Sequence, residues 1–449
     1  MGDRGPVGLS TAVLLLIAAA CTSSPSSGPS TLPSAASSSE ATASPPTSTS
    51  PGPPSPSIEG LLAFDPDAVS LRSPPRGSFL VRGAYPHVRS RCKHPEQPSL
   101  KARYPGRLSI RRADDGTLGI TVTLPFERYL EGIAEVPPSW PPAALEAQAI
   151  AARSYALAST GWSGSEGAPL PTPICATASC QVYGGIPVPS RPGIGRWYRA
   201  VRRTTGLVLL YQGRPADTLY FSTSNGHTYG NDQVFGSAPL PYLRPVAERD
   251  DGASPESHWR VTLPFRALAT FLHAASLWPK GEAISGVARH GTTMAIEGRG
   301  PDRSVDESSF ASAVNEWAPC FQPGRYPPAS PKGGRLPVTI PSRWFRGSST
   351  SGALVLNGRG WGHGVGMVQW GAYGKARRGL SAEQILAHYY GGLRPERHPE
   401  PGLIHVQVAT GLTSIKIVPS GTGARLDGRR LAPGKLQVIG GDQVIVSSR

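Results

Sequence analysis

The sequence predicts an α+β fold that is mostly antiparallel β structure with a few helices. Short runs of alternating apolar residues, bounded by Gly, Pro and Asp, occur in several places and are typical of strands. Two other segments carry helix-start signals, a proline pair in one and a capping box in the other. No tandem repeat is apparent, so a repeat architecture is not expected.

The first predicted elements are a hairpin and a helix. Residues 108–124 form two alternating runs around the turn Asp114–Asp115–Gly116. Proline is tolerated at the first helical position, so we expect a helix to begin at Pro141–Pro142 and to run through an Ala-rich stretch to about Ser159. Residues 205–223 then predict two strands joined by a turn.

The second half predicts helix, strand, helix and a small β extension. Residues 265–277 are expected to be helical and residues 283–296 mostly strand. A helix over residues 381–390 begins with Ser381 and Gln384 at the spacing of a capping box, and two glycines end it. After about Pro399, short Val/Ile runs separated by turns predict a small C-terminal β extension.

The N-terminus has the composition of a targeting segment. A short apolar run, Leu14–Ile17, follows Arg4 and is too short to span a bilayer. Small residues leading to Cys21 resemble a bacterial lipoprotein signal, in which Cys21 is lipidated; cleavage after Ala20 and secretion is the alternative. Residues 22–57 are rich in Ser, Pro and Thr and are expected to be a disordered linker.

The formal net charge of +15 favours anionic partners. No zinc finger, recognition-helix signature or RNA-binding aromatic motif is present, so nucleic acid is not expected. With a secretion signal in place, anionic cell-wall polymers or lipid head groups are the expected partners. A compositional bias towards Arg is the alternative account of the charge.

The chain has five cysteines, and removing Cys21 as a lipid site leaves an even number. An oxidising compartment then favours disulfides, for which three pairings are possible. We expect Cys175–Cys180 as a local link within a loop over residues 161–195, and Cys92–Cys320 as a long closure.

Glycine occupies every second position from Gly358 to Gly366, in the sequence GRGWGHGVG. If this stretch is extended, the glycines line one face while Arg359, Trp361 and His363 line the other. A strand with one bare face allows a polymer or another backbone to approach closely. We therefore expect a polymer-binding groove here, with an ordinary glycine-rich turn as the alternative.

Three segments together carry a family resemblance. They are residues 129–141 (YLEGIAEVPPSWP) continuing into 145–157 (LEAQAIAARSYAL), residues 220–228 (YFSTSNGHT), and residues 358–392 (GRGWGHGVGMVQWGAYGKARRGLSAEQILAHYYGG). In this order they resemble the SpoIID/LytB family, which includes stage II sporulation protein D and amidase enhancers of bacterial cell walls. The resemblance covers roughly residues 104–392 and implies a SpoIID-like fold.

The resemblance implies a lytic transglycosylase that acts on peptidoglycan, with Glu135 as its catalytic residue. The sequence departs from the family in a shorter gap between Gly132 and Glu135, in Val368 where Ser is common, and in Asn225 where Gly is common. Some sporulation members bind zinc through His and two Cys near the position of Cys175 and Cys180. Two thiols without a neighbouring His make half a zinc site, so we expect a disulfide, no metal and no cofactor.

Glu135 suits the chemistry that the resemblance implies. Lytic transglycosylation needs one acid that protonates the glycosidic oxygen and then, as a base, takes the proton from the sugar's own 6-hydroxyl. The apolar neighbours in IAEVPP favour a raised pKa for Glu135. Glu131 is the competing acid, and a role for Glu135 in charging the approach to the following helix is the structural alternative.

The remaining candidate site residues lie in the same segments. Gln148 and Arg153 are five positions apart on the predicted helix, about 140° around its axis, so they cannot both face a glycan. Arg153 either supports the substrate site or pairs with Glu146 or a loop acid. His363 either contacts sugar hydroxyls, relays a proton or supports a neighbouring loop. The full set of candidate binding residues is Gln148, Arg153, Ser224, Asn225, His227, Thr228, Arg359, Trp361, His363 and Gln369.

These observations give one domain plan and two hypotheses for function. The plan is a lipoprotein-type signal (1–21), a linker (22–57), an N-terminal extension (58–103), a SpoIID-like peptidoglycan domain (104–398) and a β extension (399–449). The first hypothesis is an extracytoplasmic lytic transglycosylase that cuts MurNAc–GlcNAc links. The second is a glycan-binding enhancer of a cell-wall amidase. Expected partners are glycan strands, an amidase and, through a lipid on Cys21, the membrane.

Overall fold

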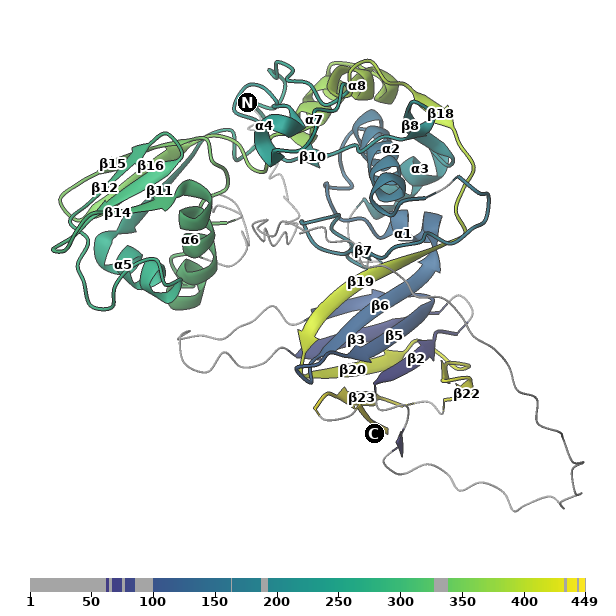
Figure 1. Cartoon of the computed structure of the whole chain (residues 1–449). Coiled ribbons are helices and arrows are strands. Elements are labelled where there is room, and N and C mark those ends of the chain that lie inside the picture. Colours follow the sequence, from purple (N-terminus) through teal and green to yellow (C-terminus); the bar gives the residue numbers. More distant parts are fainter. Residues whose placement is uncertain are drawn as a thin grey trace, which may run out of the picture.

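The computed structural model describes residues 62–63, 67–74, 77–84, 100–162, 164–186, 193–326, 338–431, 434–441 and 444–448. Helices and largely antiparallel sheets alternate along the chain, which confirms the α+β class. Figure 1 shows three parts: a β body, a helical region above it, and a lobe beside the helical region. No helix in the described part combines the length and hydropathy needed to cross a lipid bilayer.

The β body consists of two sheets that share one core. One sheet has the order β22 (Arg429–Arg430), β21 (Arg425–Leu426), β2 (Ala68–Arg72), β5 (Arg107–Arg112), β6 (Leu118–Pro125), β19 (Leu403–Leu412), β7 (Ile174–Cys175). The other has the order β1 (Leu62–Ala63), β24 (Ile445–Ser448), β23 (Leu436–Ile439), β20 (Ser414–Pro419), β3 (Phe79–Ala84), β4 (Leu100–Tyr104). Every second residue of β6 is buried, as expected for a strand with one face on a core.

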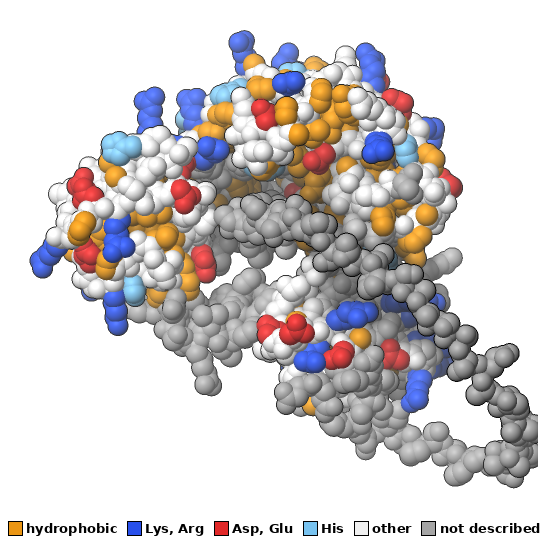
Figure 2. Space-filling model, in the orientation of Figure 1, with side chains coloured by type: hydrophobic (Ala, Val, Ile, Leu, Met, Phe, Trp, Pro, Cys, Tyr) orange, Lys and Arg blue, Asp and Glu red, His pale blue; other side chains and the backbone are white. Residues whose placement is uncertain are grey.

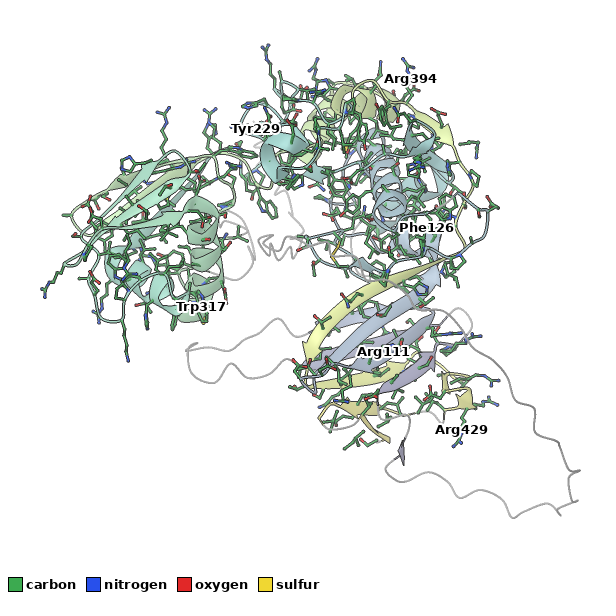
Figure 3. The ribbon with its side chains drawn as sticks, viewed as in Figure 1. Arg111, Phe126, Tyr229, Trp317, Arg394 and Arg429 are labelled. Carbon is green, nitrogen blue, oxygen red and sulfur yellow. A yellow bond between two sulfur atoms is a disulfide. The ribbon has the colours of Figure 1, made fainter. Side chains whose placement is uncertain are left out.

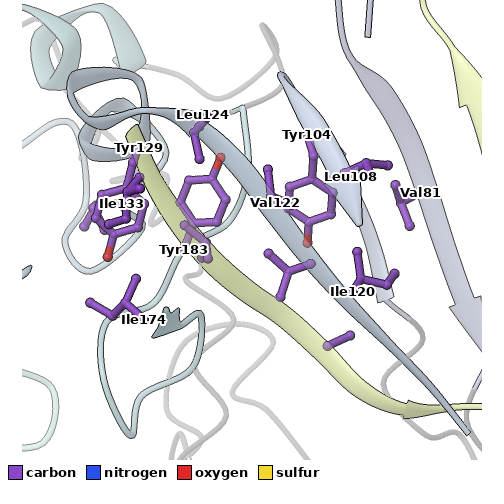
Figure 4. Close-up of a cluster of buried hydrophobic side chains, with 14 of the residues drawn as sticks. Val81, Tyr104, Leu108, Ile120, Val122, Leu124, Tyr129, Ile133, Ile174 and Tyr183 are labelled. Atoms are coloured by element: carbon purple, nitrogen blue, oxygen red, sulfur yellow. The ribbon is translucent and has the colours of Figure 1, made fainter. Parts of the chain in front are cut away.

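The predicted hairpin over residues 108–124 is confirmed. Strands β5 and β6 pair antiparallel with Ile110 opposite Ile120, and Gly116 in the turn has a φ of 77°. Figure 4 shows the core running from Val81 and Leu108 in this body to Tyr129 and Ile174 beneath the helical region. The β body therefore supports the helical region directly.

The domain plan placed separate extensions at residues 58–103 and 399–449, but the described strands of both segments belong to the β body. The C-terminal residues do form short strands, but β19 pairs along β6 and β20 pairs with β3 from the N-terminal segment. Apolar faces at both ends of the chain are thus buried in the same core. Local sequence patterns identify such strands but not their distant partners.

The helical region is built around α2 (Pro142–Ser159), whose helix was predicted from the proline pair. Pro141 is the N-cap and Pro142 the first helical residue. Alanines on most sides of α2 allow its neighbours to approach closely, and most of the helix is buried. The other helices of the region are α1 (Phe126–Glu131), α3 (Ile194–Arg203), α4 (Asn231–Phe235), α7 (Gln369–Arg377) and α8 (Ala382–Tyr389).

Two short strand groups complete the helical region. The predicted pair within residues 205–223 is only partly formed, because β8 (Leu207–Tyr211) pairs with β9 (Arg214–Pro215) and with β18 (Pro395–Arg397). Residues Tyr220–Phe221 (β10) instead pair in parallel with β17 (Met367–Val368). The predicted capping box is confirmed, since Ser381 Oγ accepts from Gln384 N and Gln384 Oε1 accepts from Ser381 N.

The lobe is inserted between the helical elements and has a core of its own. One sheet contains β11 (Trp259–Pro264), β16 (Ala353–Gly358) and β15 (Phe345–Ser349), and another contains β12 (Gly286–His290), β13 (Thr293–Glu297) and β14 (Arg303–Asp306). Helices α5 (Phe265–Ala274) and α6 (Glu307–Phe321) pack on these sheets. The sequence predicted α5 and, in residues 283–296, the strands β12 and β13. It did not predict the other strands of the lobe, α6 or the separate core.

Candidate functional site

A cleft of about 820 Å³ lies between the lobe and the helical region. Apolar side chains line the recess where the two parts meet, and Tyr229 marks this junction (Figures 2 and 3). The helical side contributes Glu135, Tyr155, Tyr220 and Gln369. The lobe contributes α6 and the loop before β15, which are joined because the Asn315 side chain exchanges hydrogen bonds with the backbone of Ile340.

Glu135 lies in the cleft because its loop pairs with the loop at residues 182–184. Ile133 and Tyr183 form an antiparallel bridge, and Ala134 N donates to the carbonyl of Val182 at 2.9 Å. A Cβ on Gly132 would lie 2.2 Å from the Tyr183 ring, so the approach of the two loops requires glycine there. Val182 N then donates to Glu135 Oε1 at 2.6 Å and fixes the carboxyl group.

Burial raises the pKa of Glu135 from 4.5 to about 7. The residue as a whole is partly exposed because it lines the cleft, while its carboxyl lies among buried groups. Hydrogen bonds from Val182 N, from Tyr220 OH at 3.3 Å and from the Gln369 side chain act in the opposite direction and lower the pKa. The balance leaves a carboxyl group that both gains and loses a proton near neutral pH.

Comparison with known proteins adds to this geometry. A family model described as SpoIID, stage II sporulation protein, matches residues 114–211, which include Glu135 and α2. An uncharacterised protein of Brachyspira hyodysenteriae is 30% identical over 281 residues, covering 62% of this chain and 68% of that protein. Stage II sporulation protein D of Bacillus subtilis is 28% identical over 279 residues, covering 60% and 74%.

The chain belongs to the SpoIID family. The amidase enhancer of Bacillus subtilis is also similar, with 28% identity over 290 residues, 58% of this chain and 38% of that protein. The chain therefore spans well under half the length of the amidase enhancer.

The prediction that residues 358–366 form an extended strand with one bare face is wrong. Gly360, Gly362, Gly364 and Gly366 have φ values of 73°, 111°, 93° and 78°, so every second residue has a positive φ and the segment is an irregular loop rather than an extended strand. The loop lies against the chain itself: a Cβ on Gly366 would be 1.9 Å from the Leu219 carbonyl, and one on Gly360 would be 2.6 Å from that of Thr223. The glycines thus allow close packing on residues 219–229 and position that segment, instead of leaving a bare face for a polymer.

His363 supports the same segment. Its Nε2–H donates to the Tyr220 carbonyl at 3.0 Å, and its Nδ1 accepts from Val365 N at 3.1 Å. Because a carbonyl only accepts and an N–H only donates, the tautomer is fixed and both ring nitrogens are engaged. Burial lowers the His363 pKa to about 4, so the ring is neutral. This geometry corresponds to the loop-supporting alternative rather than to a proton relay.

The neighbours of His363 fall into two places. Trp361 is half-buried and lines the cleft, where it bridges to Thr223 through reciprocal backbone hydrogen bonds. Arg359 is exposed and lines a separate groove on the lobe side of the loop. The segment therefore contributes Trp361 and His363, but not Arg359, to the surface that carries Glu135.

Arg153 is not a cleft residue. It is 1% exposed, and its guanidinium makes two hydrogen bonds to Glu127 at 2.9 and 3.0 Å. It also donates to the carbonyls of Val201 and Leu207 and to Thr204. Arg153 thus joins α2 to α1 and α3, so it has the structural role that was the alternative to substrate support. Its partner is Glu127 and not Glu146, which pairs with Arg203.

Gln148 lies behind the cleft and contacts Gln369. Its Oε1 accepts from Gln369 Nε2 at 3.3 Å, while its own buried Nε2 has no partner among the described residues. Gln369 in turn lines the cleft and hydrogen-bonds Glu135. The expected substrate contact of Gln148 is therefore replaced by an indirect link to Glu135.

The predicted glycan contacts at residues 224–228 do not line the cleft. Ser224 is buried and donates to Asp251, Thr228 is buried and accepts from Val246 N, and His227 is exposed beside Tyr229. Asn225 donates to Tyr229 OH and lines the separate groove. Their polar atoms fix a turn, and the cleft is lined by the preceding residues Tyr220, Phe221 and Ser222.

Tyr155 and Tyr220 are site residues that the sequence reasoning did not assign. Tyr220 donates to Glu135, and its ring meets that of Tyr155 edge-on at 6.4 Å. The signal was present for both: Tyr155 shares a helix face with Gln148, and Tyr220 opens the quoted YFSTSNGHT stretch. The lobe residues Asn315 and Arg343 also line the cleft, but they lie in no sequence motif that could have identified them.

A disulfide joins Cys175 to Cys180, with their Cα atoms 5.5 Å apart. It closes the loop that leads to Val182, and Ala178, Ser179 and Cys180 line the cleft. With both sulfurs bonded to each other, neither is a thiolate that could bind zinc. Cys320 is also disulfide-bonded, while its predicted partner Cys92 lies outside the described residues, as does Cys21.

Glu131, the competing acid, lies at the end of α1 and pairs with Arg128. It does not line the cleft. Of the two candidate carboxylates, Glu135 is the one that the structure brings into the cleft.

Proposed function

We propose that the protein is a cell-wall lytic transglycosylase that cleaves MurNAc–GlcNAc glycan strands and leaves 1,6-anhydro-MurNAc ends. The observation that carries the proposal is the Glu135 carboxyl, which lies in the cleft with a pKa of about 7 and is fixed by Val182 N. Membership of the SpoIID family supports a cell-wall role.

The reaction uses this carboxyl twice. Protonated Glu135 gives its proton to the glycosidic oxygen as the bond from that oxygen to C1 of MurNAc breaks. The 6-hydroxyl oxygen of the same MurNAc then bonds to C1, and its proton passes to the Glu135 carboxylate. The carboxyl ends protonated, no water is consumed, and the chemistry needs neither a metal nor a cofactor.

The surroundings of Glu135 suit both steps. Desolvation favours the protonated form for the first step, and the hydrogen bonds from Val182, Tyr220 and Gln369 stabilise the carboxylate that exists between the steps. Arg153 would depress the pKa if it faced Glu135, but Glu127 holds it in the interior. Among the described residues no cation forms an ion pair with Glu135, so burial keeps its carboxyl protonated up to about neutral pH.

Other carboxyl groups line the cleft, and they matter because hydrolysis would require a second one. Asp306 caps α6 by accepting from Ser309 N, and Glu307 pairs with Arg289. Asp217 is largely buried, with a pKa raised by desolvation. Asp217 is therefore the acid to remove when the two mechanisms are compared.

The test is cleavage of purified glycan strands, intact and peptide-stripped, with fragments followed by chromatography. We expect Glu135→Gln to abolish cleavage while Glu131→Gln, a matched loss of one carboxylate, and Asp217→Asn retain it. If Asp217→Asn is also inactive although folded, a two-carboxylate hydrolase replaces the proposal. If Glu135→Gln cleaves normally, the assignment of the acid is wrong.

The second candidate is a glycan-binding enhancer of an amidase, and similarity to the amidase enhancer of Bacillus subtilis favours it. In that case neither the chain nor Glu135→Gln would cleave strands, and both would stimulate a cell-wall amidase equally. Stimulation measured with both forms separates the two candidates.

We also propose an extracytoplasmic location, anchored to the membrane by a lipid on Cys21 or released into the wall. Cys21 and the linker over residues 22–57 lie outside the described residues. Metabolic labelling with a fatty acid tests this: label on the wild-type chain and none on Cys21→Ser is expected, and unlabelled wild type would indicate simple secretion.

A further inference from the structure

A second groove, of about 940 Å³, lies on the lobe and is lined by arginines. We call it the arginine groove and define it by Arg260, Arg343, Arg346 and Arg359. All four side chains are exposed, and within the described residues none has a carboxylate within ion-pair distance. Of the residues that the structure describes, no Asp or Glu lines the groove. A fifth arginine, Arg289, is engaged by Glu307.

The sheet of the lobe sets the spacing of these charges. Arg260 of β11 and Arg346 of β15 stand opposite Asn357 of β16 in one row across the three strands, and all three are exposed. Neighbouring strands are about 4.8 Å apart, which separates the two arginine backbones by roughly 10 Å. Arg343 lies two residues before the start of β15, and Arg359 directly follows β16. The charges thus cover a surface too wide for one small anion.

Acidic groups offset only part of this positive charge. Glu307 interacts electrostatically with Arg343 but forms its ion pair with Arg289, so Arg260, Arg346 and Arg359 keep exposed charges without an ion pair among the described residues. Guanidinium groups form paired hydrogen bonds with carboxylates and phosphates, so a group of exposed arginines is suited to an anionic ligand.

The groove adjoins the cleft that contains Glu135. Arg343 lines both, and Arg359 and Trp361 project from one loop into the groove and the cleft respectively. A glycan strand bound in the cleft would therefore continue past Arg343 into the arginine groove. This continuity favours groups on the same polymer over an unrelated anion.

We propose that the arginine groove binds the carboxylates carried by the glycan strand whose cleaved bond lies at Glu135. Each MurNAc bears a lactyl carboxyl, free or extended by a peptide that ends in carboxylates, so charge recurs along the strand. The inference rests on the proposed function, because it takes the strand in the cleft to be peptidoglycan. The groove would set the register and direction of that strand.

The test is equilibrium binding at low and high salt, made in the Glu135→Gln background so that the ligand is not cut. The variant Arg260→Gln/Arg346→Gln/Arg359→Gln is compared with Arg111→Gln/Arg429→Gln/Arg430→Gln, which loses the same charge from the β body (Figure 3). The probes are MurNAc–GlcNAc strands, neutral chito-oligosaccharides of equal length, and poly(glycerol phosphate).

We expect the groove variant to bind MurNAc–GlcNAc strands at least tenfold more weakly at low salt, with the difference shrinking at high salt. Chito-oligosaccharide binding should be unchanged, and the β-body variant should behave as its parent. Equal loss for both sugars, loss confined to poly(glycerol phosphate), or no loss would each overturn the proposal. Thermal unfolding shows whether the variants are folded. Strand cleavage by the chain with Glu135 intact is measured separately, so groove-dependent binding without cleavage would contradict only the proposed function.

Discussion

Replacing Glu135 with Gln should stabilise the protein at alkaline pH. Burial disfavours the charged carboxylate that Glu135 carries there, and Gln has no charge. The Glu135 pKa is about 7 in the folded chain, against an ordinary value of 4.5. At about 1.4 kcal/mol per pKa unit, the ionised carboxyl costs the fold about 3 kcal/mol.

The sign follows from the direction of the shift. Because the folded pKa is the higher one, the favourable contribution of the protonated group is complete below pH 4.5 and is lost as the pH rises through about 7. Between pH 5 and pH 8 the wild type should lose about 2–3 kcal/mol relative to Glu135→Gln. Other titrating groups are common to both proteins and cancel in this difference.

The assay is denaturant unfolding of both proteins at pH 5 and pH 8. Glu131→Gln is the control, since it removes a surface ion pair with Arg128 and should change stability by no more than about 1 kcal/mol at either pH. A stability difference between wild type and Glu135→Gln that is the same at both pH values would refute the raised pKa, whatever the catalytic activity.

Three further outcomes are expected. The rate of strand cleavage should fall about tenfold per pH unit above pH 7, because only protonated Glu135 starts the reaction; a rate that rises through this range would contradict that role. Tyr220→Phe removes a hydrogen bond that lowers the Glu135 pKa and should move this decline to higher pH, whereas a move to lower pH would show that Tyr220 acts otherwise. Gly366→Ala places a Cβ 1.9 Å from the Leu219 carbonyl at a φ of 78° and should cost about 2–5 kcal/mol in thermal unfolding, while Gly213→Ala, with open space at a φ of 73°, should cost about 1–2 kcal/mol.

Elements with local signals could be predicted from the sequence. The proline pair identified the start of α2, the Ser381–Gln384 capping box identified α8, and alternation around Gly116 identified the β5–β6 hairpin. Each signal acts within a few residues of the element that it specifies. Glu135 was assigned from the family resemblance of the segment around it, and its apolar neighbours indicated the raised pKa.

Features that depend on distant contacts could not be predicted. Alternating glycines are compatible with a bare strand face and with positive φ at every second residue, and only the packing of Gly366 on Leu219 decides between them. Arg153 required knowledge of α1, because its partner Glu127 lies 26 positions away. The lobe wall of the cleft, with Asn315, carries no motif and depends on tertiary packing.

The most direct test of the central claim is strand cleavage in water enriched in ¹⁸O, with the new ends analysed by mass spectrometry. If the 6-hydroxyl closes the ring with Glu135 as acid and then base, the wild type should produce anhydro-MurNAc ends without ¹⁸O, and Glu135→Gln should produce none. One ¹⁸O atom in each new reducing end would show that water is the nucleophile and would contradict the proposed mechanism.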